Sequence, residues 1–495
     1  MNSNEYIQNL LQQLGPGKMS SAAYDTAWVA RLGDMDRELS NQALEWVCAN
    51  QLADGSWGAK DIYYYHDRVI STLASMIALT NQGRRARDKA QIEKGLLALE
   101  KITSGATQGL AADPNGATVG FEMIAPTLVA EAEKLGIIKQ QGDRILGRIG
   151  QMRAQKMSKL AGKKINRFMT PAFSSEMAGL DGQHLLDIDN LQEINGSVGH
   201  SPSATAYYAL YVKPNNSAAF DYLHEVVSSS GVPTLIPFDV FESTWVLWNL
   251  SLIPKLHPSL LQACKPIIEK LKENWIPNRG IGLSIGYSIP DGDDTSLVFE
   301  VLAKFNQTPD IEAVLAFEEE KHFRTYHFEA NDSKSVNIHA LGALRAANFS
   351  ADSAPVQKIL NYLDRLKIAN EYWFDKWHLS PYYTTAHAII ACSGYANYII
   401  ENSINWIIAT QKSNGAWGQQ ISTAEETAYA LQALAIWKIN GGQVPLGVIK
   451  KGHKWLEEHS IAPYPALWVG KGLYCPEIVV QSAIISALEL SQEID

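Results

Sequence analysis

The chain has 495 residues, of which 46% are hydrophobic and 19% are charged, so it can form two or three domains with large cores and is not intrinsically disordered. Its formal net charge of −10 argues against a nucleic-acid-binding surface. The N-terminus lacks the features of a signal peptide, no apolar run is long enough to span a membrane, and the four cysteines form no CxxC pair. We therefore expect a cytoplasmic protein with reduced thiols and no transmembrane segment.

Helical periodicity dominates the chain. Apolar residues recur at i, i+3, i+4 and i+7, and few stretches alternate with period two. Short connections rich in Gly, Asn and Pro separate the periodic segments. This pattern predicts an all-α protein. The clearest predicted helices, in chain order, are 39–51, 68–80, 90–101, 122–135, 356–367 and 424–437.

An imperfect repeat, Q-x-x-[DN]-G-x-[WV]-G, begins at Gln51, Gln192 and Gln411. Asp or Asn followed by Gly is typical of a turn that ends a helix in a left-handed conformation, and we expect the aromatic residue to fold back onto neighbouring helices. The spacing of the copies is too irregular for a simple open solenoid. Recurrence in both halves predicts two related helical domains, with a boundary in the proline-rich stretch 232–260.

Asp291, Asp293 and Asp294 place three carboxylates within four residues, directly before the apolar run 297–302. Like charges this close cannot all ionise easily, so at least one pKa is expected to be raised. A protonated carboxyl group beside an apolar pocket can act as a general acid. The alternative interpretation is structural, because Pro-Asp-Gly is a turn and Asp, Thr and Ser are preferred helix N-caps.

The aspartates belong to an ordered set of motifs that covers almost the whole chain. Asp291-Gly-Asp293-Asp294 has the form DxDD. The other segments are SAAYDTAW at 21–28, DGSWG at 54–58, DRVISTLA at 67–74, VGFE at 119–122, SPSATA at 201–206 and FESTW at 241–245. This set resembles class II diterpene cyclases, which are relatives of copalyl diphosphate synthases and, more distantly, of squalene–hopene cyclases. Segments 377–387 and 423–429 resemble the bacterial two-domain branch that includes tuberculosinyl (halimadienyl) diphosphate synthases.

The resemblance implies two (α/α) barrel domains, called β and γ, with the active site at their interface. The β domain is expected to comprise residues 1–18 and 236–495 and to carry the DxDD motif, and residues 19–235 are expected to form the inserted γ domain. The implied reaction is the protonation-initiated bicyclisation of geranylgeranyl diphosphate with the diphosphate retained. The metal motifs of ionising class I synthases are not found, so a separate downstream terpene synthase or phosphatase is expected to use the product. The oligomeric state stays open, with a homodimer as one option.

By this resemblance, Asp293 is the general acid, and Asp291 and Asp294 orient it by hydrogen bonds, so that the three titrate as a unit. In plant relatives a Thr, and an Asn four residues later, support the cluster from a facing helix. Here Asn337 takes the first position and a leucine the second, so half of that support is missing. Asn337 and His339 are therefore the candidates for holding the carboxylates. A purely structural histidine and a capping role for Asp294 are the alternatives.

The aromatic residues of the family-like segment are candidates for stabilising the migrating positive charge. They are Trp373, Trp377, Tyr382 and Tyr383, each of which could instead be core packing. Phe173 stands where plant copalyl diphosphate synthases carry the His that holds a deprotonating water. Because an aromatic ring cannot act as a base, we expect hydride and methyl shifts to a halimadane- or clerodane-type (tuberculosinyl- or kolavenyl-like) diphosphate. A copalyl-type product without rearrangement is the alternative.

The basic run 163–167 resembles the family's diphosphate-binding segment, which makes Lys164 and Arg167 the candidates for holding the diphosphate. A solvated helix face is the alternative. Mg²⁺ is expected to accompany the diphosphate. The family's acidic segment is reduced here to Asp113, which is the candidate metal ligand.

Three other classes of protein are alternatives to this family. A glycosidase on an (α/α) barrel would need a second acid across the cleft, such as Glu242 or the pair Glu425-Glu426, and would leave the ordered motifs unexplained. Protein prenyltransferase subunits need zinc ligands that cannot be assembled from this sequence. A helical-repeat binding protein has no need of a DxDD motif.

Overall fold

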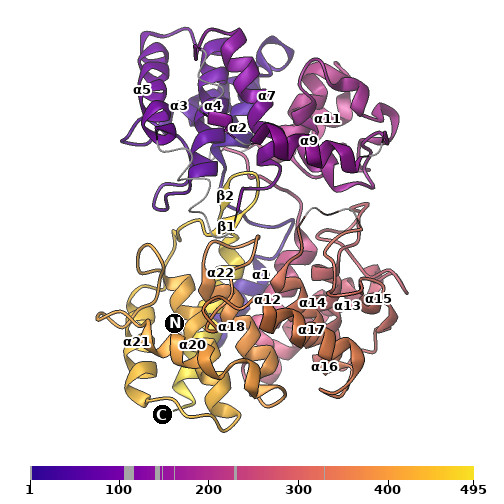
Figure 1. Cartoon of the computed structure of the whole chain (residues 1–495), viewed down its shortest axis with the longest axis vertical. Helices are drawn as coiled ribbons and strands as arrows, with labels where there is room; N and C mark the ends of the chain where they lie inside the picture. Colours follow the sequence, from indigo (N-terminus) through magenta and orange to yellow (C-terminus); the bar gives the residue numbers. More distant parts are fainter. Residues whose placement is uncertain are drawn as a thin grey trace.

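The computed structural model describes residues 3–104, 116–139, 145–147, 149–160, 162–227, 231–327, 329 and 331–494. It has two helical lobes with a short hairpin between them (Figure 1). The hairpin contains β1 (Trp468–Val469) and β2 (Leu473–Tyr474), which pair antiparallel and form the only sheet in the described part of the chain. The predicted all-α class is confirmed, and each of the six predicted segments lies on a helix.

The upper lobe is built around a closed ring of helices. In this ring α2 packs on α4, α4 on α7, α7 on η2, η2 on α10, and α10 on α2 again, while α3, α5, α9 and α11 lie outside it. The bounds are α2 (Ala23–Ala30), η1 (Gly33–Met35), α3 (Arg37–Ala49), α4 (Tyr65–Gln82), α5 (Ala86–Thr103), α7 (Phe121–Lys134), α9 (Ile149–Lys159), η2 (Thr170–Ala178), η3 (Gln183–Leu185), η4 (Ile188–Asn190), α10 (Pro202–Tyr207), η5 (Tyr208–Val212) and α11 (Ser217–Val226).

The lower lobe is a second ring, in which α12, α14, α16, α18, α20 and α22 each pack on the next and α22 closes the ring on α12. Shorter helices cover its outside. The bounds are α1 (Ser3–Gln12), α12 (Asp239–Ser251), α13 (Pro258–Asn274), α14 (Gly292–Lys304), α15 (Glu312–Leu315), α16 (Lys334–Ala346), α17 (Ala354–Arg365), α18 (Pro381–Cys392), η6 (Asn397–Ile399), α19 (Glu401–Ala409), α20 (Ala424–Ile439), α21 (Leu446–Glu458) and α22 (Glu477–Gln492).

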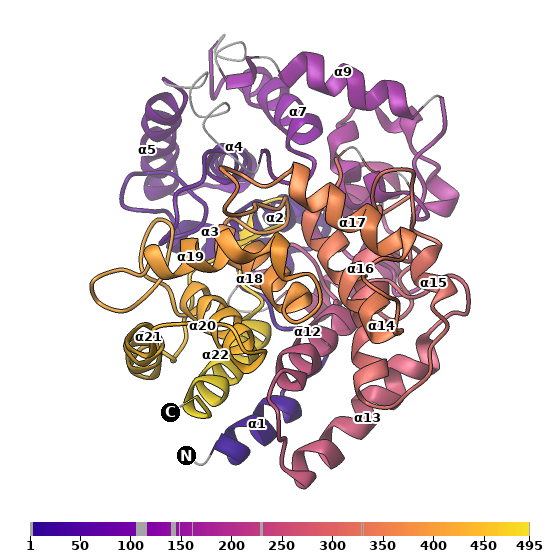
Figure 2. The ribbon, with the colours of Figure 1, turned by 60° about the horizontal axis from the view of Figure 1, so that its bottom comes forward.

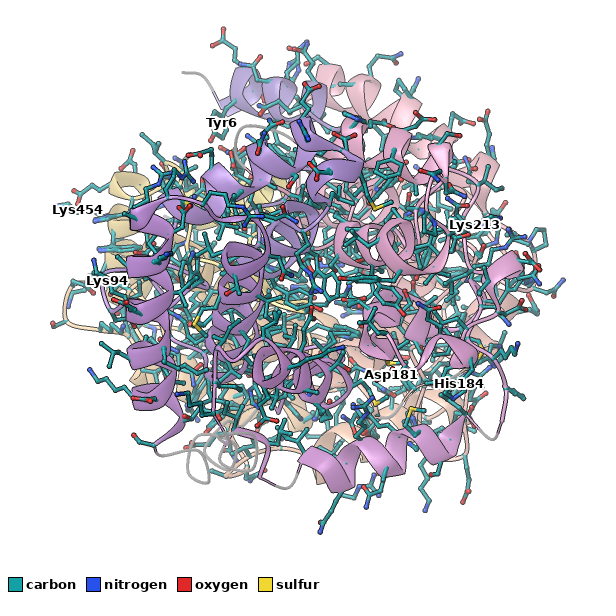
Figure 3. The ribbon with its side chains drawn as sticks, turned by 90° about the horizontal axis from the view of Figure 1, so that it is seen from above. Tyr6, Lys94, Asp181, His184, Lys213 and Lys454 are labelled. Atoms are coloured by element: carbon teal, nitrogen blue, oxygen red, sulfur yellow. The ribbon has the colours of Figure 1, made fainter. Side chains whose placement is uncertain are left out.

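Each ring encloses its own hydrophobic core. One core draws on residues between Ala23 and Val232, and the other combines Ile7, Leu10 and Leu11 of α1 with residues from Val240 to Leu490. Helix α1 therefore packs in the lower lobe, beside α13 and α22, although the upper lobe follows it in the sequence (Figure 2). Charged side chains such as the labelled Lys94, Lys213 and Lys454 lie at the periphery (Figure 3). No helix of the described ranges is long and apolar enough to cross a bilayer.

The sequence repeat has the same local structure in its three copies. The side-chain amide of Gln51, Gln192 and Gln411 donates to the carbonyl of the Gly four residues later, at 2.8, 2.5 and 2.9 Å. The indole N–H groups of Trp57 and Trp417 donate to carbonyls ten residues earlier, at 2.8 and 2.7 Å. Each turn thus ties the end of one helix to the start of the next.

The structure contains two further copies that the sequence pattern does not detect. Trp373 donates its indole N–H to the carbonyl of Leu363 (2.8 Å) and its backbone N–H to the hydroxyl of Thr385 (3.1 Å), as Trp417 does with Ile407 and Thr427. In the other copy, the backbone N–H of Ile281 donates to the hydroxyl of Thr295 (3.1 Å). The DxDD motif therefore begins an inner helix of one repeat unit.

Candidate active site

Helix α14 begins at the aspartate cluster. Asp291 is its N-cap, and its Oδ1 accepts the backbone N–H groups of Asp293 (3.0 Å) and Asp294 (2.8 Å). A Cβ atom at Gly292 would lie 2.3 Å from the carbonyl oxygen of Arg324, so the second position of the motif has no room for a side chain. The capping role weighed for Asp294 thus belongs to Asp291, and it is compatible with acid chemistry.

Burial sets the protonation of this cluster. Asp291 and Asp294 are 1% and 4% exposed, whereas the side chain of Asp293 is 15% exposed. Burial raises the pKa of Asp291 to about 7, against the lowering effect of its hydrogen bonds with Asp294. Burial, followed by the neighbouring Asp291 carboxylate, holds the pKa of Asp294 well above its usual range. The cluster therefore retains protons at neutral pH, and Asp293 is its most accessible member.

Two histidines, His339 and His387, form a chain of hydrogen-bond contacts that begins at Asp293. Nδ1 of His339, on α16, lies 2.5 Å from Oδ1 of Asp293, and its Nε2 lies 2.9 Å from Nδ1 of His387, on α18. Burial, followed by the proximity of His339, lowers the pKa of His387 well below its usual range, so His387 is neutral. Trp245 meets the His339 ring edge to face at 5.5 Å, and Trp248 stacks on His387 at 4.4 Å. His339 is thus placed directly on the predicted acid.

His387 was not among the predicted site residues. Its spacing from Tyr383 offered a sequence signal, because residues four apart on a helix share a face, and their rings lie 4.3 Å apart in the structure.

Asn337 does not hold the carboxylates, which corrects the prediction. Its side-chain amide donates to the carbonyls of Phe323 (3.0 Å) and Ser333 (2.7 Å), and its Oδ1 accepts the N–H of Phe323 (2.8 Å). Asn337 therefore fixes the loop that precedes α16. A side-chain amide can donate to a backbone carbonyl and accept from a backbone N–H at the same time, as Asn337 does with Phe323. The conformation of the loop therefore accounts for Asn337 without a contact to the aspartates.

A cavity of about 590 Å³ lies between the two lobes and is lined by residues of both. Tyr287, Tyr326 and Tyr474 line it, and the charges of the aspartates act on all three hydroxyl groups. Burial, followed by the charge of Asp291, holds the pKa of Tyr326 far above its usual range, and burial followed by Asp294 raises that of Tyr474. Such tyrosines stay neutral and present apolar ring area beside the acid cluster. The volume is in the range of small-molecule sites.

The predicted aromatic residues separate into two groups. Trp377 and Phe173 line the cavity, and Tyr383 is buried beside the acid, whose charge, after burial, helps to raise the pKa of this tyrosine. Trp373 belongs to a repeat turn in the core, and Tyr382 stacks on Trp406 of α19 at 4.8 Å. The structure therefore places Trp373 and Tyr382 in packing positions and corrects their predicted role as cation stabilisers.

The lysines at the cavity are not the predicted ones. Lys156 and Lys159, on α9, and Lys376 line it. Lys156 pairs with the cavity carboxylate Glu122 (2.9 Å), and Lys376 pairs with Glu329 (3.1 Å). Lys376 directly precedes Trp377, so its place in the family-like segment was the signal that sequence reasoning missed.

Neither Lys164 nor Arg167 is among the described residues that line the cavity, so their role as diphosphate ligands stays a prediction without support from the cavity. Lys164 is exposed, and Arg167 donates to the backbone carbonyl of Gln192 at 3.2 Å.

The predicted metal ligand, Asp113, lies outside the described residues. Within the described ranges, no three His, Cys, Asp or Glu side chains are grouped so as to hold a metal ion. The cavity carboxylates Glu122 and Glu329 are already paired with lysines. These residues do not form a magnesium site.

The carboxylates that a glycosidase would need do not face the cavity. Glu242, Glu425 and Glu426 are fully buried, and Glu425 accepts hydrogen bonds from Trp468 (2.7 Å) and from the Tyr429 hydroxyl (2.9 Å). None of the three is among the described cavity residues. This removes the sugar-hydrolysing alternative.

Comparison with known proteins agrees with this arrangement. The family model described as "Squalene-hopene cyclase C-terminal domain" matches residues 328–460. The fold is that of class II terpene cyclases: an ent-copalyl diphosphate synthase from Streptomyces platensis superposes with a TM-score of 0.80 at 26% identity, covering 99% of this chain and 100% of that one.

Sequence relatives narrow the class. The type B diterpene cyclase of Mycobacterium tuberculosis is 47% identical over 497 residues, which cover 99% of each chain. A copalyl diphosphate synthase of Streptomyces cyslabdanicus is 29% identical over 99% of this chain and 96% of its own. The chain belongs to the class II diterpene cyclase family.

Proposed function

We propose that this cyclase protonates the terminal alkene of geranylgeranyl diphosphate and closes two rings while the bond to the diphosphate stays intact. One observation carries the proposal: a carboxyl cluster that retains protons at neutral pH lies beside a cavity whose lining includes both aromatic rings and lysines. An alkene is a very weak base, so the acid that protonates it must be un-ionised and shielded from water.

Asp293 is the acid in this proposal, and its greater exposure compared with Asp291 and Asp294 supports the assignment. We assign the proton of His339 to Nδ1, from which it is donated to Oδ1 of Asp293 at 2.5 Å, so that Oδ2 carries the reactive proton. When that proton moves to the alkene, the carboxylate that forms keeps the hydrogen bond. A hydrogen bond to a charged group is stronger than one to a neutral group, so the His339 contact tightens as the reaction proceeds.

The cavity lining supports a rearranged product. Trp377 lines the cavity and Tyr383 is buried beside the acid, and the face of each ring can stabilise the migrating charge by roughly 0.5–2 kcal/mol. Phe173 lies in the cavity wall and offers no base, so the first bicyclic cation undergoes hydride and methyl shifts before it loses a proton. The product is a halimadane- or clerodane-type (tuberculosinyl- or kolavenyl-like) diphosphate. Because it retains the diphosphate, a separate terpene synthase or phosphatase consumes it.

Lys156 and Lys376 are the proposed diphosphate ligands, because both line the cavity and their carboxylate partners can exchange for phosphate oxygens. Mg²⁺ is a hard cation that phosphate oxygens bind, so we assign it to the substrate rather than to a protein site.

Replacing these two lysines is expected to weaken substrate binding. In the Lys156→Met, Lys376→Met double variant, KM for geranylgeranyl diphosphate should rise by roughly 100-fold or more, since hydrogen bonds to charged groups contribute about 1.5–3 kcal/mol each. Steady-state kinetics measures the change. The matched control is the Lys164→Met, Arg167→Met variant, whose residues lie off the cavity and whose KM should stay within about twofold of the unmodified enzyme. If KM rose more in the Lys164→Met, Arg167→Met variant than in the Lys156→Met, Lys376→Met variant, the 163–167 segment would be the diphosphate site.

The cyclisation rate is expected to fall as the pH rises above about 7. Burial raises the folded-state pKa of Asp291 to about 7, so Asp291 is protonated below that pH. The contribution of the protonated group to stability is present at low pH and is lost as the pH rises through about 7. Ionisation of Asp291 places a negative charge beside Asp293, which makes Asp293 a weaker acid. The cyclisation rate should therefore fall by up to about tenfold for each pH unit above this value. Asp291→Asn keeps the capping oxygen and should remove this inflection. An identical profile in that variant would contradict the assignment.

The proposed function is tested directly by product analysis. The enzyme is incubated with geranylgeranyl diphosphate and Mg²⁺, the mixture is treated with phosphatase, and the alcohols are identified by mass spectrometry and NMR. The proposal predicts a bicyclic alcohol with a rearranged skeleton. Inorganic pyrophosphate released before phosphatase treatment would overturn diphosphate retention, and copalol as the sole alcohol would overturn the rearrangement.

A further inference from the structure

The hairpin of the lower lobe inserts its tip between helices of the upper lobe. β1 and β2 are joined by Gly470-Lys471-Gly472 and lie between the lobes in Figure 1. The backbone N–H of Val119 donates to the carbonyl of Gly470 (2.8 Å), and that of Leu473 donates to Asp67 (3.2 Å). A Cβ atom at position 470 would lie 2.8 Å from Thr234, so the tip fits against the upper lobe only without one.

Lys471 is fully buried at this tip. Its ammonium group donates to Oε1 of Glu176 (2.6 Å) and to the hydroxyls of Ser201 (2.7 Å) and Ser203 (2.6 Å). All three acceptors belong to the upper lobe, and Tyr24 adds a hydrogen bond to the same Glu176 oxygen (2.9 Å). The three ammonium protons are thus satisfied by groups fixed on two elements of the upper ring, η2 and the start of α10.

Such an arrangement fixes position more effectively than it adds stability. Removing an ammonium and a carboxylate from water is costly. A well-packed apolar contact between the hairpin and the upper lobe would be at least as stable. Three directed hydrogen bonds instead specify a single location for the hairpin tip relative to η2. Lys471 also lies 4.5 Å from the centre of the Phe173 ring, which it contacts as a cation–π partner.

The parts that Lys471 holds together are walls of the cavity. Phe173 lines it from η2, and Val469, Gly470 and Tyr474 line it from the hairpin. A shift of the hairpin tip would therefore change the shape of the cavity where the two lobes meet. Competing fates of a carbocation differ by small energies, since about 1.4 kcal/mol between two barriers changes a product ratio tenfold.

We propose that Lys471 is a positioning residue that fixes Phe173 and the hairpin wall against each other and thereby keeps the cyclisation to one product. The inference rests on the proposed function and concerns the fidelity of the reaction rather than its initiation.

The test uses variants that keep the buried charge balanced. Lys471→Met together with Glu176→Gln removes one charge of each sign, so the net charge of the buried site is unchanged. Ser203→Ala removes one acceptor of Lys471 and leaves both charges in place. Each variant is checked for folding by thermal unfolding, and its products from geranylgeranyl diphosphate are quantified after phosphatase treatment. The control is Lys18→Met, which breaks an exposed ammonium–carboxylate contact with Glu477.

In the paired variant, the single product should give way to a mixture, with the ratio of side products to main product rising about tenfold. Ser203→Ala should shift the same ratio in the same direction by a smaller factor, and Lys18→Met should leave it unchanged. If both buried-site variants lower the unfolding temperature and leave the product ratio unchanged, Lys471 contributes only to stability and the proposal is overturned. Failure of the unmodified enzyme to cyclise the substrate would instead overturn the proposed function itself.

Discussion

Asp293→Asn is expected to abolish cyclisation, with kcat reduced by roughly 10³-fold or more, at the upper end of what a general acid contributes. The substitution removes the transferable proton and keeps the shape of the side chain. His339 can still donate to an amide oxygen at this position, so the cap of α14 and the His339–His387 pair should be preserved. The measurement is the single-turnover rate of conversion of geranylgeranyl diphosphate, together with the unfolding temperature.

The chain provides a matched control for the loss of a buried carboxylate. Glu425 stands two residues after the N-cap Thr423 of α20, as Asp293 stands two residues after the N-cap Asp291 of α14. Glu425→Gln retains the oxygen that accepts from Trp468, and it should lower the rate by less than about tenfold. If Asp293→Asn were active at the level of this control, another group would have to supply the proton.

His339→Phe has the second largest expected effect, a fall in kcat of roughly 10- to 100-fold. The phenyl ring can retain the edge-to-face contact with Trp245, but it removes the hydrogen bond to Oδ1 of Asp293. Because that bond strengthens as the carboxylate forms, its loss of about 1.5–3 kcal/mol appears mainly in the transition state and hence in kcat.

His459→Phe is the control for this substitution. His459 stacks on Trp455 of the outer helix α21 at 4.0 Å, and replacing it should leave kcat unchanged within about twofold. Unchanged kcat in His339→Phe as well would show that the histidine only packs against the acid. A raised KM with the same kcat would place its role in substrate binding.

The fold could be predicted from sequence because its periodic signals are local. The i, i+3, i+4 pattern predicted six helices correctly. The repeat could be recognised at Gln51, Gln192 and Gln411 because the Gln and the Gly that form its hydrogen bond are present in all three copies. Two copies escaped the pattern because neither keeps its Gln, although both keep the hydrogen bond from a backbone N–H to a threonine hydroxyl. Thr295, directly after the aspartates, is one of those threonines.

The acid cluster was predictable as a unit, and its surroundings were not. Local crowding at Asp291, Asp293 and Asp294 required raised pKa values, and burial provides them for Asp291 and Asp294. Which neighbours touch the acid depends on the rotation of α16 and α18 in the ring. Sequence position favoured Asn337 and His339 alike, but only His339 faces the acid.

The cavity walls come from segments far apart in the chain. Lys156 and Lys376 meet the same cavity from different lobes, and Lys471 reaches Glu176 across 295 positions. No local pattern encodes such pairings, so a basic run such as 163–167 attracted the diphosphate assignment although it lies off the cavity. Long-range placement is what the structure adds to the sequence.

In the proposed mechanism a proton from the enzyme starts the reaction. It is tested most directly by running the cyclisation in D₂O, where Asp293 exchanges its proton for deuterium, and by locating the label in the dephosphorylated product by mass spectrometry and NMR. We expect one deuterium per product molecule, on the ring methylene that was the CH carbon of the substrate's terminal alkene. A cyclised product without deuterium would contradict it.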